Sequence, residues 1–266
     1  MTKLGFIGVG NMGGAIIKGI KGKLGNTAVF AYDAAPEKLK DLGFFSATAA
    51  HSIAELSEKC DYIVLAVKPQ QLDGVLAEIK AAGNKELTLI SICAGISAEY
   101  IRERTFSNAK IVLVMPNTPM MLGEGASAIS RGEGVSDKEF EFAKKIIGSC
   151  GIVEAIPMDK MKEIIAINGS SPAFIYLFAK SFVAYAEKAG IDKDAALRLF
   201  AQSLIGSAKM MTSGPTIDEL IKQVSSPGGT TIAGLGELYD GKMLECVVRA
   251  CEACTKRAYE LGEEKK

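Results

Sequence analysis

Short apolar runs alternate with amphipathic segments over roughly the first 156 residues of the chain. The apolar runs predict strands, and most segments between them have the spacing of amphipathic helices. The predicted strands cover residues 3–8, 28–33, 61–67, 87–92, 111–115 and 152–156, and the predicted helices cover 12–23, 36–42, 70–81 and 137–149. Strands and helices that alternate in this way indicate a mainly parallel sheet with helices on both faces.

The strand pattern stops near residue 158, and the remaining pattern is helical. Ala195, Leu199, Phe200, Ser203, Leu204 and Met210 recur close to a period of 3.6 residues. Further helices are predicted at 172–189, 217–224, 231–239 and 242–261, and Pro157-Met158-Asp159 is the expected junction. The predicted fold is therefore α/β, with a Rossmann-like domain over residues 1–157 and an all-helical domain over 158–266.

The run Gly8-Val9-Gly10-Asn11-Met12-Gly13 follows the first predicted strand directly and begins the first helix. The first glycine permits a tight turn, the second lets a pyrophosphate approach the backbone, and the third allows close packing of helix and strand. Alone the pattern is a weak signal. At the start of a strand–helix–strand unit it predicts a dinucleotide site.

Other strand ends add candidates to this site. Asp33 ends the second strand 25 residues after Gly8, where a carboxylate can bond a ribose 2′-hydroxyl. That favours NADH over NADPH, although Lys38 and Lys40 could soften the repulsion of a 2′-phosphate. The alternative is a strand-ending Asp before a turn.

Two further segments lie at the same predicted edge of the sheet. Val67-Lys68-Pro69 ends one strand, and Asn117 lies between Pro116 and Pro119 after another. Asn117 could offer its amide to a nicotinamide ring. The structural alternative for Lys68 is a solvated side chain, and for the segment around Asn117 it is a rigid proline turn. Both alternatives remain open.

The segment Ser225-Ser226-Pro227-Gly228-Gly229-Thr230-Thr231 interrupts the helical pattern of the second half. Glycines let a backbone approach a ligand, and hydroxyls supply hydrogen-bond donors. A capping box at Thr216–Glu219 begins the preceding helix, and another helix can begin at Thr231. Free N–H groups at that second helix N-terminus would bind a carboxylate. On composition alone, an interhelical turn explains the segment equally well.

Composition narrows the classes of partner. Lys+Arg and Asp+Glu balance at 31 each, which removes the electrostatic argument for nucleic acid or an anionic membrane. No apolar stretch reaches the roughly 18 residues of a membrane span, and no persuasive cleavage site follows the N-terminal apolar run. We expect a soluble, cytoplasmic protein. The hydrophobic content of 48% favours burial of apolar surface in an oligomer.

His51 is the only histidine, which argues against a histidine triad or a histidine-rich metal site. Cys251 and Cys254 form the one Cys-x-x-Cys pair, and neither a second pair nor a nearby histidine completes a zinc set. No metal is expected.

Taken together, the motifs resemble the pyrroline-5-carboxylate reductase family over essentially the whole chain. The resemblance rests on five blocks in order: residues 8–13, 65–70, 91–95, 115–119 with 123–125, and 225–235. It implies NAD(P)H-dependent reduction of 1-pyrroline-5-carboxylate to L-proline, the last step of proline biosynthesis. It also implies an interlocked helical homodimer, sometimes assembled into a decamer, with substrate bound in the helical domain.

The resemblance also assigns residues. Residues 8–13 with Ala66, Val67, Lys68 and Pro69 would line the cofactor, and Ser226, Gly228, Gly229, Thr230 and Thr231 would line the substrate. Thr231 would be the catalytic hydroxyl, hydrogen-bonded to the ring nitrogen. The chain departs from the family at Gly169-Ser170-Ser171-Pro172-Ala173-Phe174, where Gly-Ser-Gly-Pro-Ala-Tyr is common, and at His51-Ser52, where an asparagine is usual.

Two other functions fit parts of the pattern. A β-hydroxyacid dehydrogenase shares the domain layout but needs a lysine base early in the first helix of its second domain. Residues 169–174 contain no lysine, and Lys180 lies well down the helix. A non-enzymatic NAD(P)-sensing protein would keep the fold without turnover, and the intact Thr231 and glycine pair argue against it.

Overall fold

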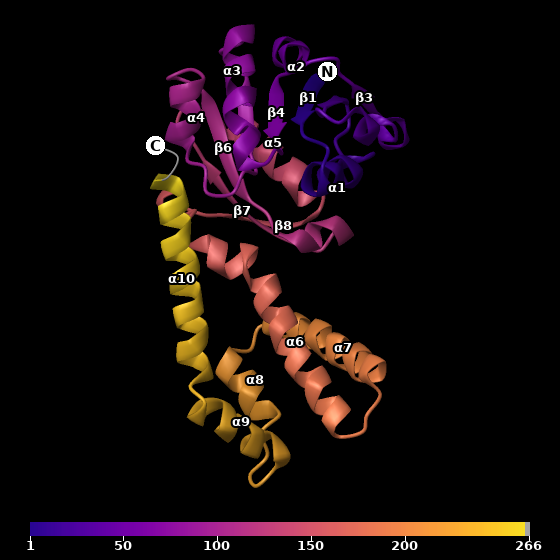
Figure 1. Cartoon of the computed structure of the whole chain (residues 1–266), viewed down its shortest axis with the longest axis vertical. Helices are drawn as coiled ribbons and strands as arrows, with labels where there is room; N and C mark the ends of the chain where they lie inside the picture. The colour runs from indigo at the N-terminus through magenta and orange to yellow at the C-terminus, as the bar shows by residue number, and fades with distance from the viewer. Residues whose placement is uncertain (264–266) are drawn as a thin grey trace. The chain divides into compact units, whose positions relative to one another are not determined.

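The computed structural model describes residues 1–263, which fold as two compact units (Figure 1). The first unit contains residues 1–170 and the C-terminal segment from Cys254, and the second contains residues 171–253. The division into domains after residue 157 stays a prediction.

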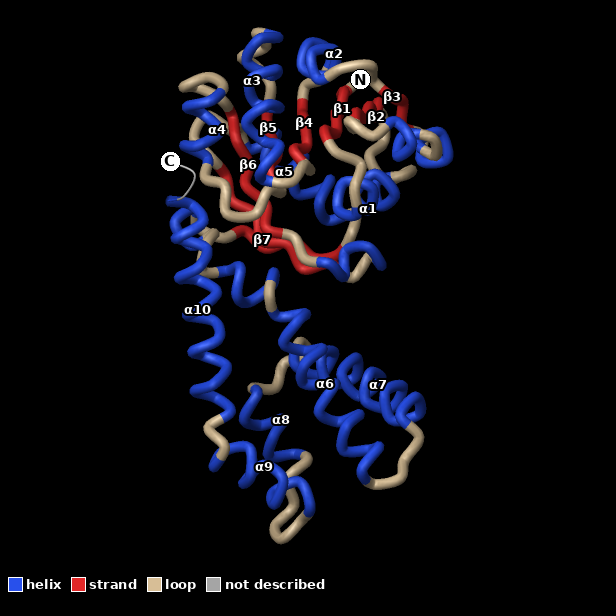
Figure 2. Tube along the Cα trace, in the orientation of Figure 1, coloured by secondary structure: helices blue, strands red, loops and turns tan. Residues whose placement is uncertain are grey.

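The first unit is built on an eight-stranded sheet of order β3-β2-β1-β4-β5-β6-β7-β8 (Figure 2). The strands are β1 (Thr2–Ile7), β2 (Thr27–Tyr32), β3 (Ala47–Ala49), β4 (Tyr62–Leu65), β5 (Thr88–Ser91), β6 (Lys110–Met115), β7 (Gly125–Arg131) and β8 (Gly151–Ala155). Only the pairing of β6 with β7 is antiparallel. The strand order reverses between β1 and β4, and open α/β sheets bind ligands at such a switch point. The Rossmann-like prediction is confirmed.

All six predicted strands are present, with ends that differ by at most two residues. The pattern does not predict β3 or β7. Only three residues form β3, and the sequence of β7 is mostly small residues with no clear alternation. Close packing buries β7 instead, since a Cβ on Gly125 would lie 2.8 Å from the carbonyl oxygen of Cys150. Tertiary contact, not local pattern, makes this strand.

Helices cover both faces of the sheet. On one face α1 (Asn11–Ile20) and α5 (Asp137–Gly148) contribute to an apolar cluster around Phe6. On the other, α2 (Ile53–Lys59), α3 (Leu72–Ala82) and α4 (Ala98–Arg104) pack around Leu65. The helix predicted over residues 36–42 is wrong, because two 3-10 helices, η1 (Pro36–Leu39) and η2 (Leu42–Phe45), occur there. In both together only Leu42 is buried, so the segment lacks the apolar stripe that stabilises an α-helix.

Glu139 ties the start of α5 to the sheet. It completes a capping box with Ser136, accepting the Ser136 N–H at 2.7 Å. The same carboxylate accepts hydrogen bonds from Lys110 Nζ and the Thr88 hydroxyl, each at 3.1 Å. Burial alone would raise the pKa of Glu139, but the bonds from Ser136 and Lys110 outweigh burial and lower the pKa to about 2.

We expect Glu139→Gln to remove a pH-dependent part of the stability. Because the folded-state pKa is about 2 against an ordinary 4.5, the stabilisation is present above pH 4.5 and lost as the pH falls towards 2. After allowance for solvent screening, this group should account for about 2 kcal/mol of the unfolding free energy lost over that range. Urea unfolding from pH 6 to pH 2 measures the effect, with Glu141→Gln on the same helix as control. Equal pH slopes for Glu139→Gln and the unsubstituted protein would contradict the assignment.

The second unit contains helices and their connecting loops. They are α6 (Ser171–Lys188), α7 (Lys193–Met211), α8 (Ile217–Gln223), α9 (Thr230–Asp240) and the first part of α10 (Met243–Glu263), as predicted. Phe182 stacks on Phe200 with ring centroids 4.1 Å apart, which joins α6 to α7. In α7, α8 and α9, all of whose residues the structure describes, no side chain is buried. Large apolar side chains lie exposed on these helices, including Leu197, Leu199, Ile205, Met210, Ile232 and Leu238. Apolar surface of this extent indicates an interface.

Candidate functional site

The glycine-rich turn between β1 and α1 has the geometry of a phosphate-binding loop. Gly8 has a φ of +100°, and a Cβ there would lie 2.5 Å from the carbonyl oxygen of Ala66. A Cβ on Gly13 would lie 2.2 Å from the carbonyl oxygen of Gly8, so these two glycines permit close packing. A Cβ on Gly10 would meet no atom within 4 Å. Gly10 is the N-cap of α1, without a side-chain cap, so open space lies beside unsatisfied N–H groups. The turn therefore fits a pyrophosphate.

A cavity of about 290 Å³ lies at the switch point of the sheet, between the ends of β1, β2 and β4. Six residues predicted to bind the cofactor line it: Gly8, Gly10, Asp33, Ala66, Val67 and Lys68. Val9 and Asn11 line a neighbouring depression over α1. Met12 and Gly13 lie in the first turn of α1 and do not line either cavity. Pro69 begins η3 (Pro69–Gln71) directly after Lys68. The fold thus brings together at one edge the segments predicted for the cofactor from β1, β2 and β4.

Asp33 holds the glycine-rich turn. Its Oδ2 accepts the N–H of Val9 at 2.8 Å, and its Oδ1 accepts the N–H of Ala35 at 2.9 Å. Lys38 Nζ lies 3.2 and 3.4 Å from the two oxygens. Burial alone would raise the pKa of Asp33, but these bonds outweigh it and hold the pKa below its usual value. Asp33 is therefore an anion in the wall of the cavity, and it also fixes the turn that precedes α1.

Cys93 connects two loops at this edge, and the sequence does not single it out. Its Sγ donates to the carbonyl oxygen of Val67 at 3.3 Å and lies 3.6 Å from that of Leu65. The thiol thereby joins the end of β5 to the end of β4. Its position in the block of residues 91–95, on which the family resemblance partly rests, is the only sequence signal that points to it.

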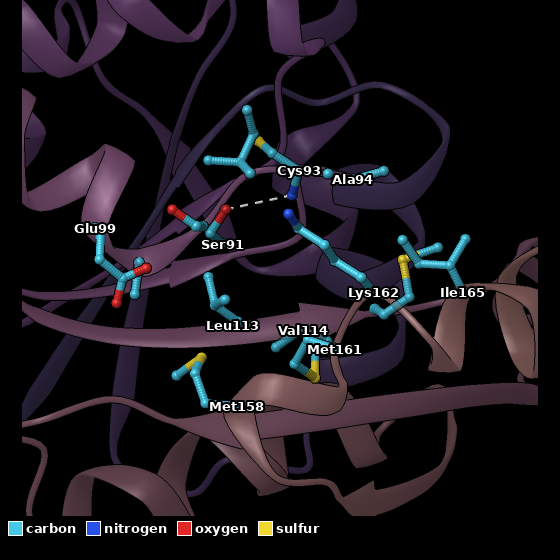
Figure 3. Close-up of a pocket in the computed structure, with 15 residues that line it drawn as sticks. Ser91, Cys93, Ala94, Glu99, Leu113, Val114, Met158, Met161, Lys162 and Ile165 are labelled. Carbon is cyan, nitrogen blue, oxygen red and sulfur yellow. Dashed lines mark hydrogen bonds between the residues drawn. The ribbon is translucent and has the colours of Figure 1, made fainter. Parts of the chain in front are cut away.

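A second, smaller cavity, of about 80 Å³, lies at the carboxyl ends of β5 and β6 (Figure 3). Its walls are mainly apolar and include Leu113, Met115 and Met161. Lys162 extends towards Cys93 in Figure 3, and the backbone N–H of Cys93 donates to Ser91 Oγ at 3.4 Å. The carboxyl edge of the sheet thus has one cavity at β1, β2 and β4 and another at β5 and β6 within the first unit.

Asn117 has a structural partner. Its side chain is buried in the turn after β6, and its Oδ1 accepts the N–H of Ala126 at 2.9 Å. This contact supports the interpretation of residues 115–119 as a rigid turn. A contact between Asn117 and the nicotinamide stays a prediction.

The glycine-threonine segment of the second unit leads into a helix without a side-chain cap. Gly229 is the N-cap of α9, which begins at Thr230, one residue earlier than predicted. Gly228 has a φ of +71°, and the N–H of Gly229 donates to the Ser226 carbonyl oxygen at 2.9 Å. The first N–H groups of α9 therefore have no helical partner. Thr230 and Thr231 are exposed there, so the segment can bind an anion. The capping box of Thr216 and Glu219 on α8 is confirmed.

The described residues contain no group of three or more His, Cys, Asp or Glu side chains arranged to hold a metal ion. Cys251 and Cys254 are free thiols on α10. In the part of the chain that the structure describes, no helix has the length and apolar character needed to cross a membrane.

Two family models match the chain. Residues 158–261 match the pyrroline-5-carboxylate reductase dimerisation model. Residues 3–95 match the model of coenzyme F420-dependent NADP oxidoreductases. The two matches correspond to most of the helical region and to the strands β1 to β5 of the sheet.

Individual relatives are similar over nearly the whole length. Pyrroline-5-carboxylate reductase 3 of Danio rerio is 34% identical over 267 residues, covering 99% of this chain and 93% of the relative. The crystal structure of Plasmodium falciparum pyrroline carboxylate reductase with NADP bound is 32% identical, with a TM-score of 0.86 and 98% coverage of both chains. A pyrroline-5-carboxylate reductase structure from Coxiella burnetii is 29% identical, with a TM-score of 0.91 and 98% coverage of both chains.

Proposed function

This chain belongs to the pyrroline-5-carboxylate reductase family, and we propose that it reduces 1-pyrroline-5-carboxylate to L-proline with NAD(P)H. It is an oxidoreductase with a Rossmann-like nucleotide-binding fold. The observation that carries the substrate assignment is the uncapped N-terminus of α9. It presents Gly228, Gly229, Thr230 and Thr231 within the region that matches the family's dimerisation model.

The chemistry needs positioning more than acid–base catalysis. When bound, the reduced nicotinamide supplies the hydride. Hydride adds to the imine carbon, the C=N electron pair moves to nitrogen, and the ring becomes that of proline. A protonated cyclic imine is already an electrophile, so no strong general acid is required.

Two parts of the substrate need partners. The backbone N–H groups of Gly228 and Thr230 bind the carboxylate, and the Thr231 hydroxyl hydrogen-bonds the ring nitrogen. The free N–H groups at the start of α9 and the exposed Thr231 support these roles.

The second unit pairs with a second copy of the chain. The dimerisation model covers it, and its exposed apolar side chains would gain burial in a homodimer. A decamer built from such dimers is the larger assembly that we propose from the family resemblance.

NADH is the preferred cofactor in this proposal. The carboxylate of Asp33 is ionised, its side chain is 9% exposed, and it lines the same cavity as Gly8 and Gly10. A 2′-phosphate bound there would be repelled, whereas a 2′-hydroxyl can donate to the carboxylate. Lys38, whose Nζ lies 3.2 Å from the same carboxylate, weakens this repulsion.

We expect Asp33→Asn to lower the ratio of kcat/KM for NADH to kcat/KM for NADPH by roughly tenfold, about 1.4 kcal/mol. The amide keeps an acceptor for one backbone N–H while removing the charge. Steady-state kinetics with both cofactors measures the ratio. Asp61→Asn is the matched control, because Asp61 also accepts a backbone N–H, that of Lys3 at 2.8 Å, but at the amino end of the strands. An unchanged ratio in Asp33→Asn would remove Asp33 from cofactor selection.

Steady-state oxidation of NADH and NADPH with 1-pyrroline-5-carboxylate tests the function, with proline identified as product. A six-membered cyclic imine carboxylate in parallel reports on ring size. A panel of β-hydroxy acids with NAD⁺ or NADP⁺ tests the dehydrogenase alternative. Cofactor binding without turnover of any imine would overturn the proposal and favour a sensor.

A further inference from the structure

The antiparallel ladder between β6 and β7 stops at a proline. The last registered pair is Met115 with Ala128, and Pro116 follows Met115 without an N–H to donate. Continuing the same register would place Asn117 opposite Ala126. At that position the side-chain Oδ1 of Asn117, in place of a backbone carbonyl oxygen, accepts the Ala126 N–H at 2.9 Å.

Asn168 supplies the other half of this replacement. It lies in the π-helix η6 (Ile165–Gly169), and its Nδ2 donates to the Met115 carbonyl oxygen at 2.6 Å and to that of Ala126 at 3.0 Å. Asn117 and Asn168, the asparagine clamp, together satisfy both backbone groups of Ala126 and the last carbonyl of β6. The end of β6 is therefore held by side chains from two other segments.

The clamp is buried and its orientation is determined. Asn117 is 8% exposed and Asn168 9% exposed. Two carbonyl oxygens face Asn168, so its NH₂ group must point to them and its Oδ1 must point away. That Oδ1 is buried and accepts no hydrogen bond from any residue that the structure describes. Such an acceptor costs stability and offsets part of what the two hydrogen bonds from Nδ2 contribute, which leaves room for a role beyond folding.

The π-helix also presses on Met115 directly. A Cβ on Gly169 would lie 2.3 Å from Met115 Cε, so only glycine leaves room for that side chain in its present place. Met115 in turn lines the cavity at the carboxyl ends of β5 and β6. Asn168 thus holds the backbone of Met115, and Gly169 leaves room for its side chain. π-helical turns of this kind often occur at functional sites.

We propose that Asn168 is a positioning residue for the nicotinamide half of the cofactor, acting through Met115 and the turn at residues 116–119. The inference rests on the proposed function and adds a path for the cofactor, from the cavity beside Asp33 and Gly10 along the carboxyl edge towards the cavity at β5 and β6. Adenosine and pyrophosphate then bind beside Asp33 and Gly10, far along the edge from the clamp. Loss of the clamp should disturb the nicotinamide end and leave the other end unchanged.

The test compares binding of NADH with binding of ADP-ribose, which lacks nicotinamide, by calorimetry. Asn168→Ser should weaken NADH binding about tenfold and lower kcat, while ADP-ribose binds as before. Asn84→Ser is the matched control, since Asn84 also bonds two backbone groups, Ser57 O at 2.8 Å and Glu86 N at 3.2 Å, before β5 at the opposite edge. It should leave the ratio of the two affinities unchanged.

Gly169→Ala gives a second, independent measurement if Asn168→Ser folds poorly. It keeps both Asn168 hydrogen bonds and displaces the flexible end of Met115, so it should also weaken NADH selectively. Equal loss of NADH and ADP-ribose, or an unchanged ratio in both variants, would overturn the proposal. Failure of the unsubstituted protein to turn over the imine would overturn the proposed function instead, because the binding ratio is measured without substrate.

Discussion

Thr231→Ala is expected to lower kcat/KM for 1-pyrroline-5-carboxylate by roughly 10- to 150-fold while NADH affinity stays nearly constant. One hydrogen bond to a charged group is worth about 1.5–3 kcal/mol, and in the proposed mechanism this bond is made to the nitrogen of the protonated imine. Thr231 is exposed in the first turn of α9, and no described residue forms a side-chain hydrogen bond with its hydroxyl. The hydroxyl is therefore available to substrate. Alanine favours helix, so α9 should persist.

Steady-state kinetics at saturating NADH, with direct titration of NADH, measures both quantities. Thr231→Ser keeps the hydroxyl and should recover most of the activity, whereas Thr231→Val keeps the shape and should resemble alanine. If Thr231→Ala has the kcat/KM of the unsubstituted protein, the hydroxyl has no part in the reaction.

Gly10→Ala is expected to weaken binding of both NADH and NADPH by roughly 10- to 100-fold without lowering the melting temperature. A Cβ at Gly10 meets no protein atom within 4 Å, so the fold can accept it. The same Cβ projects into the space beside the N-terminus of α1 where the pyrophosphate must approach. Overpacking of this kind costs about 1–3 kcal/mol.

Calorimetric titration and thermal unfolding separate the two effects. Gly43→Ala is the control, because a Cβ there also meets nothing within 4 Å and Gly43 lies outside the turn. Gly13→Ala should behave differently, since its Cβ would lie 2.2 Å from the Gly8 carbonyl oxygen and should lower stability as well. Normal cofactor affinity in Gly10→Ala would refute the placement of the pyrophosphate over Gly10.

Features that depend on near neighbours were predictable. Capping at Thr216 and Glu219 joins residues three apart, and the five helices of the second unit follow their apolar period. The six predicted strands are runs in which most residues are apolar. β7 was missed because its residues are mostly small and it forms through pairing with β6 and β8, which no local pattern records.

The same distinction between near and distant neighbours applies to the residues of the candidate site. By itself the sequence determined the glycine-rich turn, the strand-ending Asp33 and the Gly228–Thr231 segment, because each depends on backbone freedom or chemistry within a few residues. Only the tertiary structure decided that Asp33 holds Val9, that Cys93 joins Val67, and that Asn168 replaces part of a sheet ladder. These hydrogen bonds join residues 24 to 53 positions apart. Chain packing alone brings such donors and acceptors within 3 Å or so of each other, and no local pattern records that contact.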